Sequence, residues 1–162
     1  MRIDGVELWA LLYKLDDPAH LEAPQGFDWN AARRQFDCLV ARLNTAFQTT
    51  CETDRSIEDA SYHAEVTVPA DATATGGNLV VRVSNFGNLA VLALENPGAY
   101  DQEEFDALVH ESDLTRIYEC LDEGDYTLVA EAPLWEPYDG RVTAWVFLSS
   151  KPSWWIRYFD YL

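Results

Sequence analysis

Positively charged side chains are scarce in this sequence. Lysine and arginine together number 11, against 28 aspartates and glutamates, which gives a formal net charge of -17 at pH 7. A nucleic acid is bound by neutralising its phosphates with lysine and arginine, and an anionic membrane surface attracts the same basic side chains. We therefore expect neither nucleic acid nor a membrane surface among the direct partners of this chain.

Cysteine and long apolar runs are also rare. Cys38, Cys51 and Cys120 show no C-x-x-C spacing, so they predict neither a disulfide framework nor a zinc site. We expect reduced thiols, with Cys38 buried beside an apolar helix face. No apolar stretch approaches the ~20 residues that span a bilayer, and Asp4 and Glu7 interrupt the early apolar run in which a secretory signal would lie. These observations lead us to expect a cytoplasmic protein.

The familiar catalytic and ligand-binding motifs are missing as well. The sequence contains no H-E-x-x-H, G-x-S-x-G, G-x-x-x-x-G-K-[ST] or G-x-G-x-x-G. The histidines His20, His63 and His110 are scattered, and the acidic run at 122–125 lacks the alternating ligands and the glycine of a calcium loop. We expect no catalytic residues, no bound metal and no cofactor.

The sequence does contain ample material for one ordered core. It has 162 residues, of which 48% are hydrophobic and 13% aromatic. This length suits a single domain that needs no disulfide or metal to fold. Because no internal repeat or low-complexity linker divides the chain, we expect one domain over residues 1–162.

Apolar side chains recur at steps of three and four residues, which is typical of helices. The stretches with this spacing are 5–15, 29–47, 101–110, 113–124 and 153–162. Asp28 precedes the stretch 29–47, Asp101 and Asp113 begin the two stretches after it, and each of the three is predicted to cap its helix. A strand remains the alternative for 5–15, and one bent helix the alternative for 101–124. In the last stretch, Arg157 falls on the polar side.

A second group of stretches has the alternation or the β-branched composition of strands. These stretches are 60–69, 79–83, 89–94, 126–132 and 142–149. The second and third are joined by a short turn at 84–88, and the first three together predict an antiparallel meander. Helices flank the runs of strands and do not alternate strictly with them. We therefore predict an α+β fold with an antiparallel sheet of about five strands and helices packed on it.

The acidic residues are concentrated in one part of the chain. Between Glu95 and Asp125 there are eleven acidic side chains and a single basic one, Arg116. The segment that follows is rich in aromatic residues, among them Trp135 and Trp154. Such a field steers cationic partners, and aromatic side chains often anchor interfaces.

This distribution favours a small protein-binding inhibitor that masks a basic partner, as an immunity protein masks a bacterial toxin. Size, charge and the missing motifs support this hypothesis, and no motif ties the chain to a family. The residues predicted to contact the partner are Glu103, Glu104, Asp106, Glu111, Asp122, Glu123, Asp125, Trp135, Glu136, Tyr138 and Asp139.

Two alternatives remain open at this point. Glu131, Glu136 and Asp139 lie near a predicted strand end beside aromatic residues, where two carboxylates of unequal pKa would serve a small enzyme. The chain could also be a non-catalytic subunit or adaptor whose apolar surface another chain covers.

Overall fold

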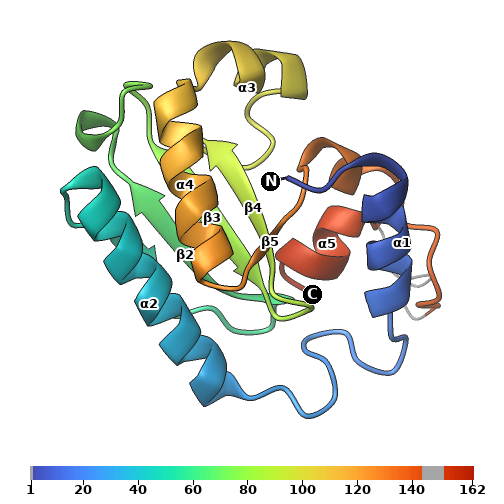
Figure 1. The fold of residues 1–162 in the computed structure, drawn as a ribbon. Helices are drawn as coiled ribbons and strands as arrows, with labels where there is room; N and C mark the ends of the chain where they lie inside the picture. Colours follow the sequence, from blue (N-terminus) through green and yellow to red (C-terminus); the bar gives the residue numbers. More distant parts are fainter. Residues whose placement is uncertain (1, 144–151) are drawn as a thin grey trace.

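The computed structural model describes residues 2–143 and 152–162, in which helices pack on a five-stranded sheet (Figure 1). The five strands lie in the order β1 (Glu52–Asp54), β2 (Tyr62–Val68), β3 (Leu79–Ser84), β4 (Leu89–Leu94) and β5 (Thr127–Leu128). The helices are α1 (Gly5–Leu15), α2 (Trp29–Phe47), α3 (Gln102–Leu108), α4 (Glu111–Glu123) and α5 (Trp154–Phe159), with short 3₁₀ turns η1 (Ala70–Ala72) and η2 (Ala132–Trp135). Strands β1 to β4 are antiparallel, which confirms the predicted fold class, whereas β5 runs parallel to β4.

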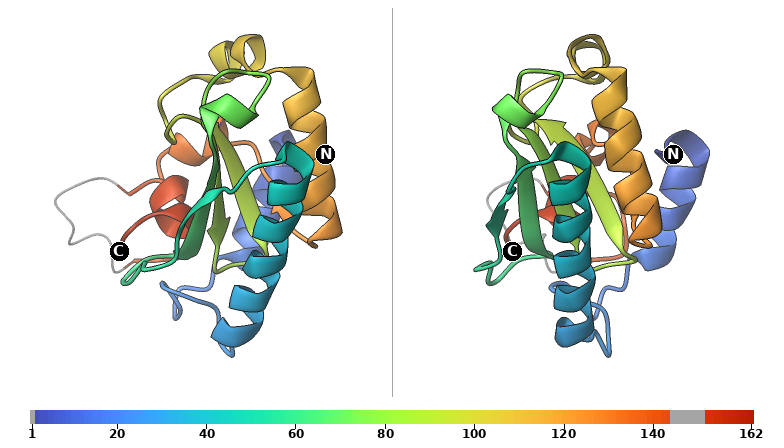
Figure 2. Two further views of the ribbon diagram at one scale, coloured as in Figure 1. Left: turned by 90° about the vertical axis from the view of Figure 1, so that its left-hand side faces the viewer. Right: turned by 60° about the vertical axis from the view of Figure 1, so that its left-hand side comes forward.

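The sheet separates two hydrophobic cores. Helices α2 and α4 cover one face, and α5 packs on the other (Figure 2). Successive side chains of a strand point to opposite faces. On β4 this places Leu92 and Leu94 in the core under α2 and α4, and Leu89 and Val91 in the core that α1 and α5 complete. All six residues of β4 are buried.

The first two helices form where the sequence predicts them. Asp4 caps α1, so the strand alternative for 5–15 is wrong. The carboxylate of Asp28 accepts a hydrogen bond of 2.9 Å from the Ala31 amide and caps α2. Among the described residues, no helix is both long and apolar enough to cross a bilayer.

The segment 101–124 forms two helices and not one bent helix. Asp101 and Glu104 make the reciprocal capping box of α3. The predicted cap of α4 is wrong, because His110 caps this helix and Asp113 lies within it, fully buried. Asp113 instead accepts hydrogen bonds from the loop after η1.

Two strand predictions need correction. Of the predicted strand 126–132, only Thr127–Leu128 forms a strand beside β4. The Val129 amide still donates a hydrogen bond to the Ala90 carbonyl of β4, and Ile3 bridges Val129 along the opposite edge. Val142 and Thr143 belong to no strand, and the rest of the predicted strand 142–149 lies outside the described residues. The short strand β1 at Glu52–Asp54 was not predicted.

Arg157 was predicted on the polar side of the last helix, but it is fully buried. Its guanidinium donates a 2.8 Å hydrogen bond to Asp16, which is buried as well, and further hydrogen bonds to the carbonyls of Asp17, His20 and Leu21. The loop after α1 therefore wraps around Arg157 and fastens α1 to α5.

Candidate functional site

The predicted partner-binding acids of α3, of α4 and of the turn after α4 are all exposed. They are Glu103, Glu104, Asp106, Glu111, Asp122, Glu123 and Asp125. Some have local partners: Asp106 lies 3.8 Å from Arg2, and Glu123 lies 3.5 Å from Arg42. Three other acids of the segment 95–125 serve the fold: Asp113 is buried, Glu95 accepts hydrogen bonds from Asn78, and Asp101 caps α3.

One set of these acids lies along a single side of α4. Glu111, Glu119 and Asp122 are exposed and follow one another at steps of eight and three residues, so they share a helical face. The opposite face buries Ile117 and Leu121. Within the described part of the chain, none of the three carboxylates forms an ion pair. We call these three residues the acidic stripe.

The predicted contacts after β5 divide between two hollows. Glu136 and Asp139 line one hollow with Trp9 and Trp154, and its volume is about 680 Å³. Tyr138 is half-buried, because its hydroxyl donates a 2.5 Å hydrogen bond to Asp16. Tyr138 therefore supports the loop 137–142 from inside.

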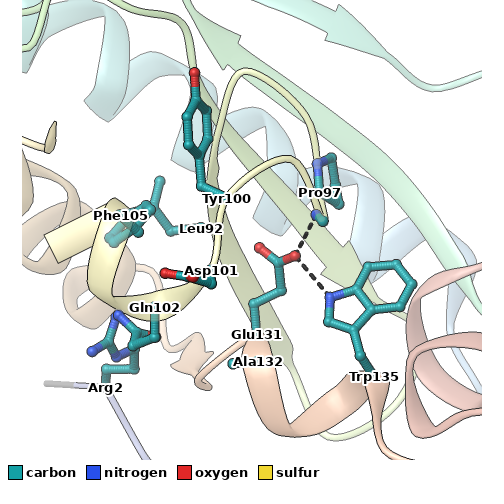
Figure 3. Close-up of a pocket in the computed structure, with 11 residues that line it drawn as sticks. Arg2, Leu92, Pro97, Tyr100, Asp101, Gln102, Phe105, Glu131, Ala132 and Trp135 are labelled. Atoms are coloured by element: carbon teal, nitrogen blue, oxygen red, sulfur yellow. Dashed lines mark hydrogen bonds between the residues drawn. The ribbon is translucent and has the colours of Figure 1, made fainter. Parts of the chain in front are cut away.

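Trp135 borders the second hollow, which we call the Glu131 pocket. Its volume is about 550 Å³, and its walls come from Arg2, Leu92, the segment 97–105 and the segment 131–135 (Figure 3). The Trp135 side chain is 44% exposed, and its indole stacks on Trp155 with the ring centres 4.7 Å apart. The pocket combines apolar walls with a few polar groups, as ligand pockets commonly do.

Glu131 is held in this pocket by two donors. Its Oε1 atom accepts hydrogen bonds from the Gly98 amide at 2.5 Å and from the Trp135 indole at 3.0 Å. Figure 3 shows Oε2 pointing away from both donors, toward the side where Asp101 lies. Burial raises the pKa of Glu131, although the two donors and Arg82 act in the opposite direction.

Gly98 explains how the loop approaches the indole so closely. Its φ of +78° is a conformation that residues with a side chain rarely adopt. A Cβ atom at this position would also lie 3.1 Å from Cζ2 of Trp135. The Asn96-Pro97-Gly98 turn is thus the sequence signal of a close approach, but its partner, Trp135, is remote in the chain.

The sequence did not predict the Glu131 pocket as a unit. Of its lining residues, Trp135 was predicted to contact a partner and Glu131 was proposed only as an enzymatic carboxylate. Tyr100 and Phe105 were not predicted in any functional role, although both line the pocket. They meet Glu131 only because the β4–α3 connection lies beside η2, a long-range contact that no local pattern indicates.

The three carboxylates predicted for a small enzyme do not line one common pocket. Glu131 lines one hollow, while Glu136 and Asp139 line the other. Burial raises the pKa of Cys51 to about 11 and also raises the pKa of Cys120. Cys38 is exposed, so its predicted burial is wrong: it lies one residue off the buried face of α2.

No metal site emerges from the described residues either, because no group of three or more histidine, cysteine, aspartate or glutamate side chains converges there. Comparison with known protein families, with characterised proteins and with solved structures finds no match to this chain.

Proposed function

We propose that this protein is a small acidic inhibitor that binds and masks a basic protein partner in the cytoplasm, as an immunity protein masks a bacterial toxin. The observation that carries the proposal is the acidic stripe: Glu111, Glu119 and Asp122 present three carboxylates on an exposed helix face, and none of them forms an ion pair with a described residue.

Electrostatics explains why such a surface suits rapid capture of a basic protein. A patch of one sign steers a partner of opposite sign and increases the association rate, mainly at low ionic strength. The exposed acids of α3, such as Glu103, extend the negative surface beyond α4. Trp135 adds an exposed aromatic side chain of the kind that anchors interfaces.

The product of the open reading frame beside this protein's gene is the first partner to test, because immunity genes adjoin the genes of the toxins they neutralise. Association rates are measured with the purified proteins at low and high salt. We expect tight binding of a basic product whose association rate decreases as salt increases. A salt-insensitive association, or no association, would contradict the proposal.

A matched pair of variants distinguishes the effect of the acidic stripe on association from the effect of net charge. The stripe variant carries Glu111→Gln, Glu119→Gln and Asp122→Asn. The control carries Glu7→Gln, Glu52→Gln and Glu58→Gln, which neutralise three exposed acids elsewhere. We expect the stripe variant to associate at least about tenfold more slowly and the control to change much less. Equal effects would show that the stripe is not the contact surface.

A further inference from the structure

The Glu131 pocket contains a carboxylate oxygen that no described residue satisfies. Both hydrogen bonds to Glu131 go to Oε1, and Oε2 points into the pocket (Figure 3). A half-buried carboxylate gains from a hydrogen-bond donor at its second oxygen, and most from a charged donor. The geometry therefore leaves room for one more donor, which must come from a ligand or from solvent.

Nearby cations are already engaged elsewhere. Arg2 lines the pocket but lies 3.8 Å from Asp106. Arg82 donates to Glu65 at 2.7 Å and to the carbonyl of Phe159 at 2.8 Å. No described cation forms an ion pair with Glu131, and the carboxylate of Asp101 lines the same pocket. The charge of Glu131 is therefore not paired with a described cation, and a cationic ligand would neutralise it.

The walls of the pocket suit a cation with an apolar stem. Leu92 and Phe105 provide apolar surface, and the exposed indole of Trp135 provides a ring that attracts cations. The same layer of aromatic side chains already holds a guanidinium, because Arg82 lies over the ring of Trp155 at 5.3 Å and Trp155 stacks on Trp135. A guanidinium is planar, weakly hydrated and able to donate several hydrogen bonds at once.

We infer that the Glu131 pocket receives an arginine side chain of the basic partner, with the guanidinium bound to Oε2 of Glu131 on the side where Asp101 lies and the methylenes against Leu92 and Phe105. This inference rests on the proposed function for the source of the arginine. It adds to that function a specific anchoring point, distinct from the steering surface of α4, and arginine is among the side chains that most often dominate binding energy.

A small probe tests the pocket without the partner. The purified protein is titrated with N-acetyl-arginine N-methylamide and with the corresponding citrulline amide, which has nearly the same shape but no charge. The readouts are the NMR signals of the Trp135 indole N–H and the Gly98 amide, the two donors to Glu131; Trp135→Phe assigns the indole signal. A ligand of this size binds a matched pocket with a Kd on the order of 1 mM.

We expect the arginine probe to shift both signals and to bind at least about tenfold more tightly than the citrulline probe. Glu131→Gln should remove this preference, because glutamine can still accept the two hydrogen bonds but carries no charge. Glu7→Gln, an exposed acid of α1 outside the pocket, should retain it. Absence of binding at tens of millimolar, equal binding of both probes, or an unchanged preference in Glu131→Gln would overturn the inference.

The experiments distinguish an error in the pocket inference from an error in the proposed function. If the stripe variants weaken a salt-dependent association but the arginine probe does not bind, the pocket inference is wrong and the inhibitor proposal stands. If no basic partner associates while the probe binds with the expected preference, the pocket recognises arginine-like cations and the inhibitor proposal is wrong.

Discussion

The pair Asp16 and Arg157 concentrates more interactions than any exposed ion pair of the described chain. Both side chains are fully buried, and Asp16 also accepts hydrogen bonds from the Tyr138 hydroxyl and the Arg141 amide. Ionised groups in a protein interior are costly unless every donor and acceptor is satisfied. Removing one partner therefore leaves an uncompensated buried charge as well as broken hydrogen bonds.

We expect Arg157→Met to lower the free energy of unfolding by about 3–5 kcal/mol, measured by urea denaturation at pH 7. The matched control is Arg42→Met, which breaks the exposed pair with Glu123 and should cost less than about 1 kcal/mol. Asp16→Asn in the Arg157→Met background should restore part of the loss, because the buried charge is then removed. Similar losses for Arg157→Met and Arg42→Met would refute this role of the buried pair.

At the scale of elements, Asp113 joins helix α4 to the loop after η1. Its carboxylate accepts hydrogen bonds from the amides of Ala74 and Thr75 and from the Thr75 hydroxyl at 2.6 Å. Burial opposes the ionisation of Asp113, but these hydrogen bonds and the charge of Arg116 outweigh it and hold the pKa below its usual value. The ionised carboxylate is thus the form that fastens the loop to the helix.

A lowered pKa in the folded state fixes the sign of the pH dependence. The stabilisation from Asp113 is fully present above the usual aspartate pKa of about 4 and is lost as pH falls through the lower pKa of the folded protein. We expect Asp113→Asn to lower the free energy of unfolding by about 1–3 kcal/mol at pH 7, with a smaller difference near pH 3. Urea denaturation at both pH values measures this.

The control for Asp113→Asn is Asp71→Asn, an exposed aspartate of η1 in the same loop, which should change stability by no more than about 0.5 kcal/mol. Hydrogen exchange of the Ala74 and Thr75 amides should accelerate in Asp113→Asn alone. A pH-independent difference from wild type would show that the charge of Asp113 does not fasten the loop.

The elements also show what a sequence can and cannot predict. Helix α2 has a helical apolar face and strand β2 a two-residue alternation, whereas β3 and β4 are short apolar runs bounded by turns, and all of these patterns are local. Beside β5, Ile3 bridges Val129 and accepts a hydrogen bond from the Ala130 amide, and no local pattern indicates this contact because Ile3 is far away in sequence. Burial of Arg157 depends on carbonyls at 17–21, which no helical pattern around residue 157 contains.

The candidate site also has a part that could be predicted from the sequence and a part that could not. The exposure of the acids on α3 and α4 follows from their spacing opposite apolar residues, so the charged surface was predictable. The Glu131 pocket was not, because it is formed where the β4–α3 connection lies beside η2. Tyr138 is of a residue type that is common in interfaces, but its hydroxyl donates a hydrogen bond to Asp16. Only the folded chain reveals that partner.

At the scale of the whole molecule, the net charge of -17 opposes folding through self-repulsion. Self-repulsion lowers the free energy of unfolding most where like charges lie close together and where negative charges lie at the negative end of a helix dipole. Both conditions hold at the end of α4, whose last turn contains no basic residue and carries Asp122, with Glu119 just before it.

We therefore expect Glu119→Gln with Asp122→Asn to increase the free energy of unfolding by about 0.5–1.5 kcal/mol at low ionic strength, and the gain to decrease at high salt because counter-ions screen the repulsion. Urea denaturation at about 0.01 M and 0.5 M NaCl measures both effects. The control, Glu52→Gln with Glu58→Gln, removes the same net charge from exposed positions outside any helix and should gain less. An equal gain would mean that only net charge matters. A larger gain for the α4 variant would show that the position of the acidic stripe on α4, and not only its net charge, lowers the stability of the protein. Such a cost in stability is expected of a surface that serves binding.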